Sequence, residues 1–370
     1  MERKCLVKTS GDWLLTGDKI NIALIDDSAL VRQVITEIIK SEKSFNLLFT
    51  ASDPIFAIEK MKANWPDVII LDIEMPRMDG ITFLKKIMSE HPTPVVVCST
   101  LTLEHSETTM NALASGAVDI ITKPQLGLKN FLNESSNRLI DAIQGAAKSN
   151  VKRIISITEL NQKKNEKPIQ HSTFTSVKLN TTEKLVAIGT STGGTIALEY
   201  ILTRLDNPCP GIVIVQHMPE KFTKAFADRL NNLCSIEVKE AQDGDRIVPG
   251  RALIAPGNYH MSVKRNGAQY IVEVHDGPLV SRHRPSVDVL FRSFARNVGM
   301  NGIALILTGM GDDGAGGMRD MFDAGVLTFA QNEESCVVFG MPKEAIRRGG
   351  VNKIIDLSEI PQIISNLKNL

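Results

Sequence analysis

The sequence predicts an α/β protein with two blocks, each organised as a doubly wound, mostly parallel sheet. Short apolar runs alternate with helix-like stretches through residues 20–143 and again through residues 181–370. Charged or polar residues follow many of these runs directly, as side chains at the carboxyl ends of buried strands do. Residues 144–180 are interpreted as a linker between the blocks, and residues 1–19 as an N-terminal extension.

The first block contains five apolar runs of strand length with helical patterns between them. Five repeats of strand and helix predict an open parallel sheet whose ligands bind at the carboxyl ends of its strands. The first helical pattern covers Ser28–Ser41, and the Ser28 hydroxyl is suited to cap its N-terminus. The predicted strands are Ile20–Ile25, Asn46–Thr50, Val68–Leu71, Val95–Cys98 and Asp119–Thr122.

The second block repeats this alternation with one interruption. Asn266-Gly267 is a strong signal for a type I′ turn, and it predicts a hairpin of Tyr259–Lys264 with Gln269–Val274. The other predicted strands are Leu185–Ile188, Ile212–Gln216, Ile236–Glu240, Ala252–Ala255, Ile303–Thr308 and Val326–Ala330. The predicted helices are Gly194–Arg204, Glu220–Leu230, Val287–Asn297, Ala315–Ala324 and Pro342–Arg348.

Composition narrows the class of protein. Lys and Arg number 42 against 42 Asp and Glu, so net charge favours neither nucleic acid nor anionic lipid. Five dispersed cysteines indicate a reducing compartment and argue against a disulfide framework or a zinc site. Residues 1–19 lack the apolar core of a signal peptide, and no apolar run approaches ~20 residues. We expect a cytoplasmic, monomeric protein without membrane insertion.

The predicted linker is basic, with seven Lys or Arg residues against two Glu. Because strong apolar repeats are scarce there, we interpret it as a solvated tether that is helical at its start and mobile through Asn161–Thr175. A docking surface is the alternative.

Acidic residues gather at the predicted strand ends of the first block. Asp26 and Asp27 follow the first strand, Asp72 follows the third, and Lys123 follows the fifth. Such a set is costly to bury unless it holds a divalent metal such as Mg²⁺ and an anion. Asp72 could then attack a phosphoryl donor, and the Ser99 hydroxyl could follow the phosphate. A single Asp after a strand is more often a helix N-cap, but the whole set favours chemistry.

The first block resembles the receiver domain of two-component response regulators, which has a flavodoxin-like fold. The resemblance implies that a histidine kinase phosphorylates Asp72 and that Lys123 contacts the phosphate, with Ser99 at the switch position. It also implies Mg²⁺ held by Asp27, Asp72 and the Glu74 carbonyl, assisted by Asp26. The motifs that carry the resemblance are Asp26-Asp27-Ser28, Asp72-Ile73-Glu74-Met75-Pro76, Asp79-Gly80 and Lys123-Pro124.

In the second block, Ser191 stands in a glycine-rich turn between a predicted strand and a predicted helix. Gly189 and Gly193 flank it in the G-x-S-x-G pattern of a nucleophilic serine. A dinucleotide-binding loop is the alternative, but G-x-G-x-x-G from Gly189 would need glycine where Ser191 stands. We therefore expect a nucleophile rather than a phosphate loop.

A serine nucleophile needs a base and an acid that orients the base. His217 follows one predicted strand, and Asp312 and Asp313 follow another, so parallel strands would bring them to the same rim as Ser191. The order Ser, His, Asp disfavours an α/β-hydrolase, in which the acid precedes the histidine. No H-x-x-x-H or C-x-x-C spacing indicates a metal site. The histidines at positions 260, 275 and 283 compete as bases: the first two fall in the hairpin region and the third in a basic loop.

The second block resembles the catalytic domain of chemotaxis protein-glutamate methylesterases, and the order of the two blocks matches that family. The resemblance implies Ser191 as nucleophile, His217 as base and Asp313 as orienting acid, with Met310 and Thr192 at the oxyanion site. Thr190 replaces a small residue, and Asp312 stands where asparagine is common and could compete with Asp313 for the histidine. The motifs are Ile188-Gly189-Thr190-Ser191-Thr192-Gly193-Gly194, Gln216-His217-Met218-Pro219, Arg284-Pro285-Ser286-Val287-Asp288 and Leu307-Thr308-Gly309-Met310-Gly311-Asp312-Asp313-Gly314.

The expected activity is phosphorylation-regulated hydrolysis of glutamate γ-methyl esters on membrane-embedded chemoreceptors, with deamidation of receptor glutamines, through an acyl-enzyme and without a cofactor for hydrolysis. The resemblance further implies that the receiver packs over the catalytic cleft until Asp72 is phosphorylated. One alternative is a response regulator whose second domain only binds a partner, although balanced charge and the lack of a recognition helix disfavour nucleic acid. A nucleotide-dependent enzyme is a weaker alternative.

Overall fold

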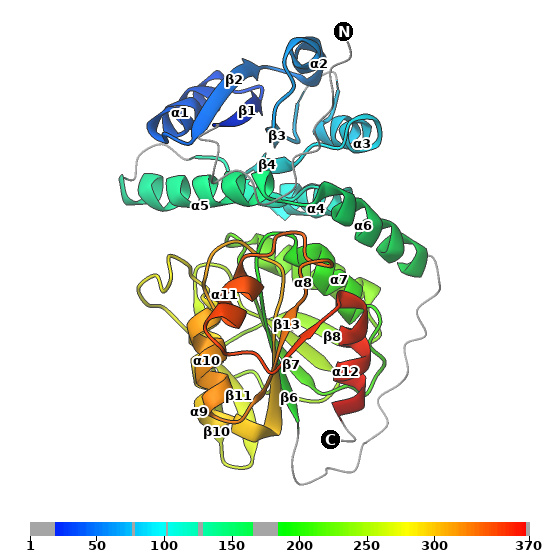
Figure 1. Cartoon of the computed structure of the whole chain (residues 1–370), viewed down its shortest axis with the longest axis vertical. Coiled ribbons are helices and arrows are strands. Elements are labelled where there is room, and N and C mark those ends of the chain that lie inside the picture. The colour runs from blue at the N-terminus through cyan, green and yellow to red at the C-terminus, as the bar shows by residue number, and fades with distance from the viewer. Residues whose placement is uncertain (1–18, 76–77, 101–102, 125–128, 166–183, 368–370) are drawn as a thin grey trace.

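The computed structural model describes residues 19–367 apart from 76–77, 101–102, 125–128 and 166–183. These residues form two parallel sheets and a separate hairpin. The first block lies above the second, with α4, α5 and α6 between the two sheets (Figure 1). The predicted N-terminal extension falls outside the described residues except for Lys19.

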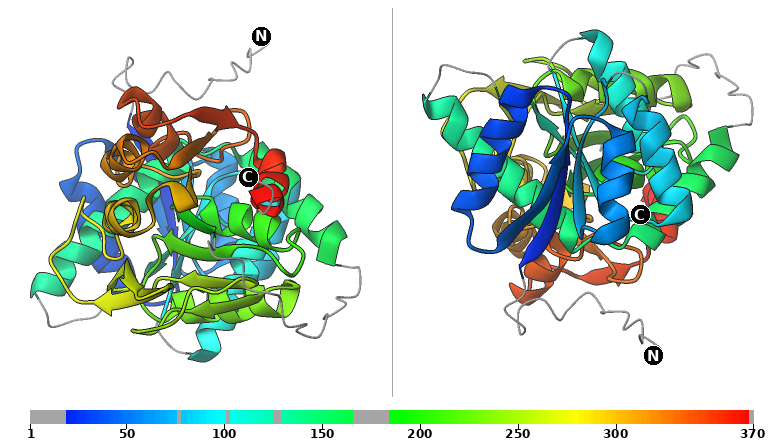
Figure 2. Two further views of the ribbon diagram at one scale, coloured as in Figure 1. Left: turned by 90° about the horizontal axis from the view of Figure 1, so that it is seen from below. Right: turned by 90° about the horizontal axis from the view of Figure 1, so that it is seen from above.

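The sheet of the first block has the order β2-β1-β3-β4-β5, and all its neighbouring strands are parallel. This is the strand order of flavodoxin-like folds, so the predicted fold is confirmed. Helices lie on both sides of the sheet when the molecule is seen from above (Figure 2). The strands are β1 Ile20–Ile25, β2 Phe45–Ala51, β3 Val68–Asp72, β4 Val95–Ser99 and β5 Asp119–Thr122.

The helices of this block begin where the sequence places capping residues. Ser28 accepts a hydrogen bond from the Val31 amide at 3.4 Å and caps the first helix, as predicted. Asp53 and Asp79 cap the next two helices in the same way. The helices are α1 Ala29–Ser41, α2 Pro54–Ala63, α3 Gly80–Glu90, α4 Leu103–Ala114 and α5 Lys129–Ala147.

The sheet of the second block is also parallel throughout, in the order β14-β13-β12-β6-β7-β9-β8. All six predicted strands are present; the edge strand β14 was not predicted, because three residues are too few for a periodic pattern. The strands are β6 Leu185–Thr190, β7 Gly211–Gln216, β8 Glu237–Glu240, β9 Arg251–Ile254, β12 Gly302–Ile306, β13 Leu327–Gln331 and β14 Lys353–Ile355.

Helices connect these strands, and all five predicted helices are found within a few residues of their predicted ends. The last helix, α12, was not predicted. Its opening Ile360-Pro361 places proline in the first turn, where a helix tolerates it. The helices are α7 Gly194–Leu202, α8 Phe222–Leu233, α9 Val287–Asn297, α10 Ala315–Asp323, α11 Met341–Arg347 and α12 Ile360–Asn366.

The hairpin consists of β10 (His260–Asn266) and β11 (Gln269–His275), close to the predicted bounds. Its predicted turn type is wrong. Asn266 pairs with Gln269, so the two turn residues are Gly267 and Ala268, and of these Gly267 alone has a positive φ, at 61°. Glycine with positive φ at the first central position is the signature of a type II′ turn.

The helical start predicted for the linker is present, but the solvated-tether interpretation is wrong for residues 144–165 because this segment is packed against the second block. The end of α5 and the whole of α6 (Val151–Asn165) are helical, and α6 packs against α7. Ile154 and Ile157 are buried, and the Asn161 amide donates to the Ile196 carbonyl at 3.1 Å. The buried isoleucines form a short apolar face on α6, and this face is the signal in the sequence that indicates packing. The rest of the predicted linker lies outside the described residues.

A continuous buried apolar cluster runs from the first sheet through α5 and α6 to one face of the second sheet. The hairpin, α9 and α10 cover the other face. The two blocks therefore share a packed interface, and this interface lies over the rim where the predicted site residues of the second block occur.

Candidate active site and acidic pocket

Ser191 and His217 directly follow two adjacent parallel strands, β6 and β7. The His217 amide donates to the Thr190 carbonyl at 3.1 Å, and the Gln216 side chain donates to the Ser191 carbonyl at 3.0 Å. Gly193 caps α7 with a φ of 78°, a conformation that suits glycine in the sharp turn after the serine. The turn thus brings the serine and the histidine together, as the strand pattern predicts.

Asp313 is buried at the edge of the His217 ring. His217 Nε2 lies 2.8 Å from Asp313 Oδ2, which also accepts from the Val287 amide at 2.7 Å. Asp313 Oδ1 accepts from the Ser286 hydroxyl at 2.7 Å and the Asp288 amide at 3.1 Å. Burial acts to raise the pKa of Asp313, but hydrogen bonding and the charge of His217 outweigh it and hold that pKa below its ordinary value.

The neighbouring Asp312 pairs with a different residue. Its carboxylate accepts from Arg348 Nη2 at 2.7 Å, and the side chain is 49% exposed. Among the described contacts, His217 pairs with Asp313 and Asp312 pairs with Arg348. The geometry therefore separates the two aspartates, which the sequence leaves as competitors.

Thr190 stands where the resemblance leads one to expect a smaller residue. It fits this site because its hydroxyl donates to the Thr308 carbonyl at 2.9 Å. Thr192 Oγ1 donates to Asp119 of the first block at 3.1 Å. Met310 is half-buried at the same rim. Ser191, Thr192, His217 and Met310 all line one pocket of about 270 Å³.

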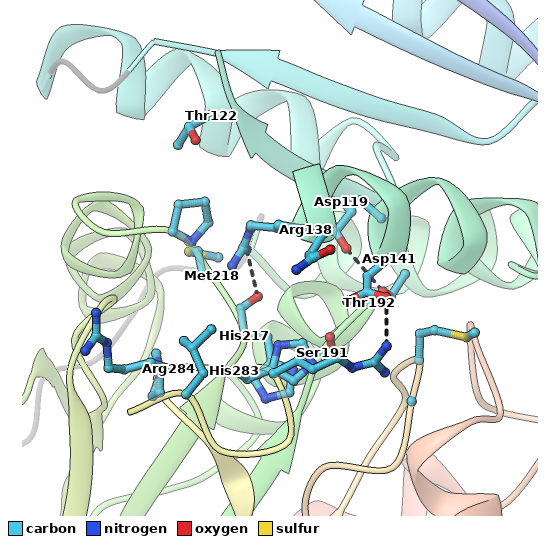
Figure 3. Close-up of a pocket in the computed structure, with 18 of the residues that line it drawn as sticks. Asp119, Thr122, Arg138, Asp141, Ser191, Thr192, His217, Met218, His283 and Arg284 are labelled. Carbon is cyan, nitrogen blue, oxygen red and sulfur yellow. Dashed lines mark hydrogen bonds and ion pairs between the residues drawn. The ribbon is translucent and has the colours of Figure 1, made fainter. Parts of the chain in front are cut away.

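That pocket lies between the two blocks, and both contribute to its walls (Figure 3). From the first block, Arg138 Nη2 donates to the His217 carbonyl at 3.4 Å, and Asp141 lies 3.9 Å from Arg282. Burial raises the pKa of Asp119, while the nearby charge of Arg138 opposes that rise. Periodicity in the sequence gave no sign of these first-block residues, because it does not say how two blocks dock.

The three other histidines that could serve as the base occupy different places in the structure. His260 lies 2.9 Å from the Pro278 carbonyl, and His275 lies 3.0 Å from the Ser262 hydroxyl, both in the hairpin region. His283, in contrast, stacks on His217 with ring centroids 3.8 Å apart. The structure therefore brings into the site a residue that sequence reasoning placed in a basic loop; the neighbouring Arg284-Pro285-Ser286 motif was the available signal.

The acidic pocket of the first block assembles as predicted. Asp26, Asp27 and Asp72 present oxygen atoms that all lie within 4.8 Å of one another. Lys123 Nζ contacts Asp72 Oδ2 at 2.6 Å and Asp26 Oδ2 at 3.5 Å. Burial, followed by the charge of Asp72, raises the pKa of Asp26 to about 6. Burial also raises the pKa of Asp72.

The donor set fits Mg²⁺, which prefers carboxylate and carbonyl oxygens. Asp26 Oδ2 is buried and accepts no hydrogen bond among the described residues, with Lys123 Nζ 3.5 Å away, so it could still serve as a ligand oxygen. The Glu74 amide donates to Asp72 Oδ1 at 3.0 Å, which places the Glu74 backbone beside the pocket. Ser99 is buried at the end of β4, where its hydroxyl accepts from Thr109 of α4 at 2.9 Å.

No helix among the described residues is long and apolar enough to cross a membrane. Cys98, Cys209, Cys234 and Cys336 are all buried, and none of them forms a disulfide within the described part of the chain.

Comparisons with known proteins agree with this architecture. Residues 22–132 match the family model of the response regulator receiver domain, and residues 186–364 match that of the CheB methylesterase. A protein-glutamate methylesterase/protein-glutamine glutaminase 2 of Dechloromonas aromatica is 58% identical over 94% of this chain and 98% of its own. The protein of the same name from Pseudomonas syringae pv. tomato is 59% identical over 95% of this chain and 99% of its own. A receiver block docked on a serine–histidine–aspartate block, matched over nearly full length, places this chain in the family of chemotaxis protein-glutamate methylesterases/protein-glutamine glutaminases.

Proposed function

We propose that this protein hydrolyses glutamate γ-methyl esters on chemoreceptors, releases methanol, and deamidates receptor glutamines by the same chemistry. The observation that carries the proposal is that His217, paired with buried Asp313, lines the same pocket as Ser191. A serine, a histidine and a buried carboxylate in this relation support acyl transfer through a covalent intermediate.

In the proposed mechanism, Ser191 Oγ attacks the ester carbonyl and His217 takes its proton. His217 Nε2 is occupied by Asp313, whereas Nδ1 is buried and has no hydrogen-bond partner among the described residues. Nδ1 is therefore the atom that receives the proton and returns it to the departing methanol or ammonia. Water then hydrolyses the acyl-enzyme.

The oxyanion that forms on the substrate needs backbone donors. The amide of Gly194, at the start of α7, already donates to the Ser191 carbonyl at 2.8 Å. We assign this role to the backbone at Met310, beside the nucleophile in the pocket, with Thr192 in support. One such donor contributes about 3 kcal/mol to transition-state stabilisation.

Regulation is proposed to act through phosphorylation of Asp72 by a histidine kinase. Mg²⁺ would be held by Asp27, Asp72 and the Glu74 carbonyl, assisted by Asp26. The metal would offset the charge of the phosphoryl group. Lys123 would then transfer its contact from Asp72 to the phosphate. Ser99 would turn toward the phosphate and leave Thr109.

The domain interface is the element that this switch would bias. First-block residues contact Thr192 and the His217 carbonyl, and the α5–α6 turn lies over Met310, with Lys148 Nζ 3.9 Å from its sulfur. We infer that these contacts restrict the access of a receptor segment to Ser191. Phosphorylation would therefore open a covered site rather than build a new one.

Replacing Arg138 by alanine should raise the activity of the unphosphorylated protein. The variant loses the hydrogen bond to the His217 carbonyl and leaves Asp119 without its nearby cation. We expect basal methanol release to increase at least about fivefold, the lower range of allosteric couplings, and the stimulation by phosphodonor to shrink. Lys152→Ala, an exposed cation on α6, is the matched control. Unchanged basal release in Arg138→Ala would contradict this role.

Replacing Asp26 by asparagine should stabilise the metal-free protein. Three carboxylates crowd this pocket, and burial with Asp72 nearby raises the pKa of Asp26 to about 6. Removing the charge stabilises the fold at pH 7 by up to about 3 kcal/mol, since one pKa unit corresponds to about 1.4 kcal/mol. Urea unfolding in EDTA measures this, with the exposed Glu59→Gln as control. Added Mg²⁺ should stabilise the wild type more than Asp26→Asn; equal responses would remove Asp26 from the ligand set.

The deciding experiment for the proposed function is methanol release from methyl-labelled receptor membranes, with and without a small-molecule phosphodonor plus Mg²⁺. We expect slow release by the wild type and faster release with phosphodonor. No release under either condition would favour the alternative of an output domain that only binds a partner.

A further inference from the structure

A tight turn at Val280–His283 carries unusual backbone strain next to the active site. Val280 and His283 exchange two backbone hydrogen bonds, of 3.1 and 2.9 Å. Ser281 and Arg282 between them have φ values of 50° and 69°. Two positive φ values define a type I′ turn, which normally carries Asn and Gly. A left-handed non-glycine residue costs about 1–2 kcal/mol, and such strain persists where the surroundings require the geometry.

The strained turn delivers one side chain to the catalytic histidine. The rings of His283 and His217 are nearly parallel, with an interplanar angle of 13° and a centroid separation of 3.8 Å. Figure 3 shows both rings at the floor of the pocket, close to Ser191. Because Asp313 binds the edge of the His217 ring and His283 covers its face, the two contacts together restrict the plane of the imidazole.

The turn is anchored to the same residues that hold Asp313. Ser281 Oγ donates to Asp288 Oδ2 at 3.3 Å, and the Asp288 amide donates to Asp313. A single segment therefore supports the acid of the triad and covers the base. A residue that merely filled space would need neither the strained turn nor this anchor.

The charge state of His283 matters because His217 becomes cationic during acyl transfer. Burial, followed by the charge of His217, lowers the pKa of His283 well below its ordinary value. Asp313 opposes this shift, whereas Arg138 and Arg282 add to it. An uncharged ring therefore faces His217, and the π-face of an aromatic ring attracts a cation.

We propose that His283 is a positioning residue for the esterase reaction: its stacked ring fixes the imidazole of His217 so that Nε2 faces Asp313 and Nδ1 faces Ser191. The proposal rests on the proposed function and adds to it a fourth side chain that acts through the base. The required property is a flat, uncharged ring at position 283. Phenylalanine supplies that property, and alanine and arginine do not.

The test compares His283→Ala, His283→Phe and His283→Arg in the full-length protein with phosphodonor and Mg²⁺. His275→Ala, a hairpin histidine outside the pocket, is the matched control. We measure kcat and KM for methanol release, and the rate at which a fluorophosphonate labels Ser191. Misplaced catalytic groups cost on the order of 100-fold, so His283→Ala should lose about that factor in kcat and in labelling rate, with KM unchanged.

His283→Phe should recover most of both rates. His283→Arg should stay impaired, because a fixed cation on the face of His217 opposes its protonation. A wild-type kcat in His283→Ala, or failure of His283→Phe to recover activity at an unchanged melting temperature, would overturn the proposal. Methanol release that persists in Ser191→Ala would instead overturn the proposed function, so the two failures are distinct.

Discussion

Replacing Ser191 by alanine is expected to abolish methanol release. Ser191 offers its hydroxyl in the pocket beside His217, and no other residue is proposed to form the acyl-enzyme. In a serine hydrolase, loss of the nucleophile lowers kcat by about 10⁶-fold, which corresponds to about 8 kcal/mol of transition-state stabilisation. The measurement is methanol release from methyl-labelled receptor membranes, together with fluorophosphonate labelling.

Ser358→Ala is a suitable control, because that serine is exposed and bonds only locally to Asp356 among the described residues. The Ser191→Ala protein should keep its melting temperature and its response to Mg²⁺, since the acidic pocket lies in the other domain. Release within tenfold of wild type would mean that another group performs the attack. The triad assignment would then have to be abandoned.

The positions of the site residues along the chain were predictable because parallel strands converge. Asp26, Asp72 and Lys123 each lie at the end of an apolar run, and their meeting requires only that the runs be nearby parallel strands of one sheet. The same reasoning brought Ser191 and His217 together. It could not choose between two adjacent aspartates, because that choice depends on which one points inward under α9 and which one outward.

The sequence pattern could not predict the contacts between the two domains. Arg138 and Asp119 look like ordinary polar residues of a helix and a strand, and only the docked geometry places them over the active site. The sequence pattern places α6 in the predicted tether because the apolar face of this helix is short and surrounded by lysines, whereas in the structure α6 packs on α7. The strong Asn-Gly signal predicts a turn at Asn266-Gly267, one residue before the turn in the structure. The local sequence does not determine how the two strands pair.

His283 shows the same limit in the active site. In sequence it is one histidine among several, next to two arginines. Its importance arises from a backbone conformation, positive φ at Ser281 and Arg282, that nothing in those residue types requires. Strain imposed by tertiary structure is the kind of feature that local propensity misses at functional sites.

Asp313→Asn is expected to lower kcat by about 10⁴-fold, the effect of the equivalent change in a serine protease triad. The physical reason is the tautomer of His217. Asp313 Oδ2 accepts the Nε2 proton, which leaves Nδ1 free to accept the proton of Ser191. An amide nitrogen at that position would donate to Nε2 and move the ring proton to Nδ1, where it blocks the attack.

The matched control is the adjacent Asp312→Asn. Asp312 contacts Arg348 at the half-exposed rim, so its loss removes one surface ion pair, worth about 0–1 kcal/mol of stability, and should leave kcat unchanged. Both variants remove one negative charge from neighbouring positions, and therefore long-range electrostatics cannot explain a difference between them. Measuring kcat for methanol release in both proteins, with melting temperatures as a check on folding, decides the assignment. Equal losses would show that the two aspartates share the histidine, and a loss confined to Asp312→Asn would exchange their roles.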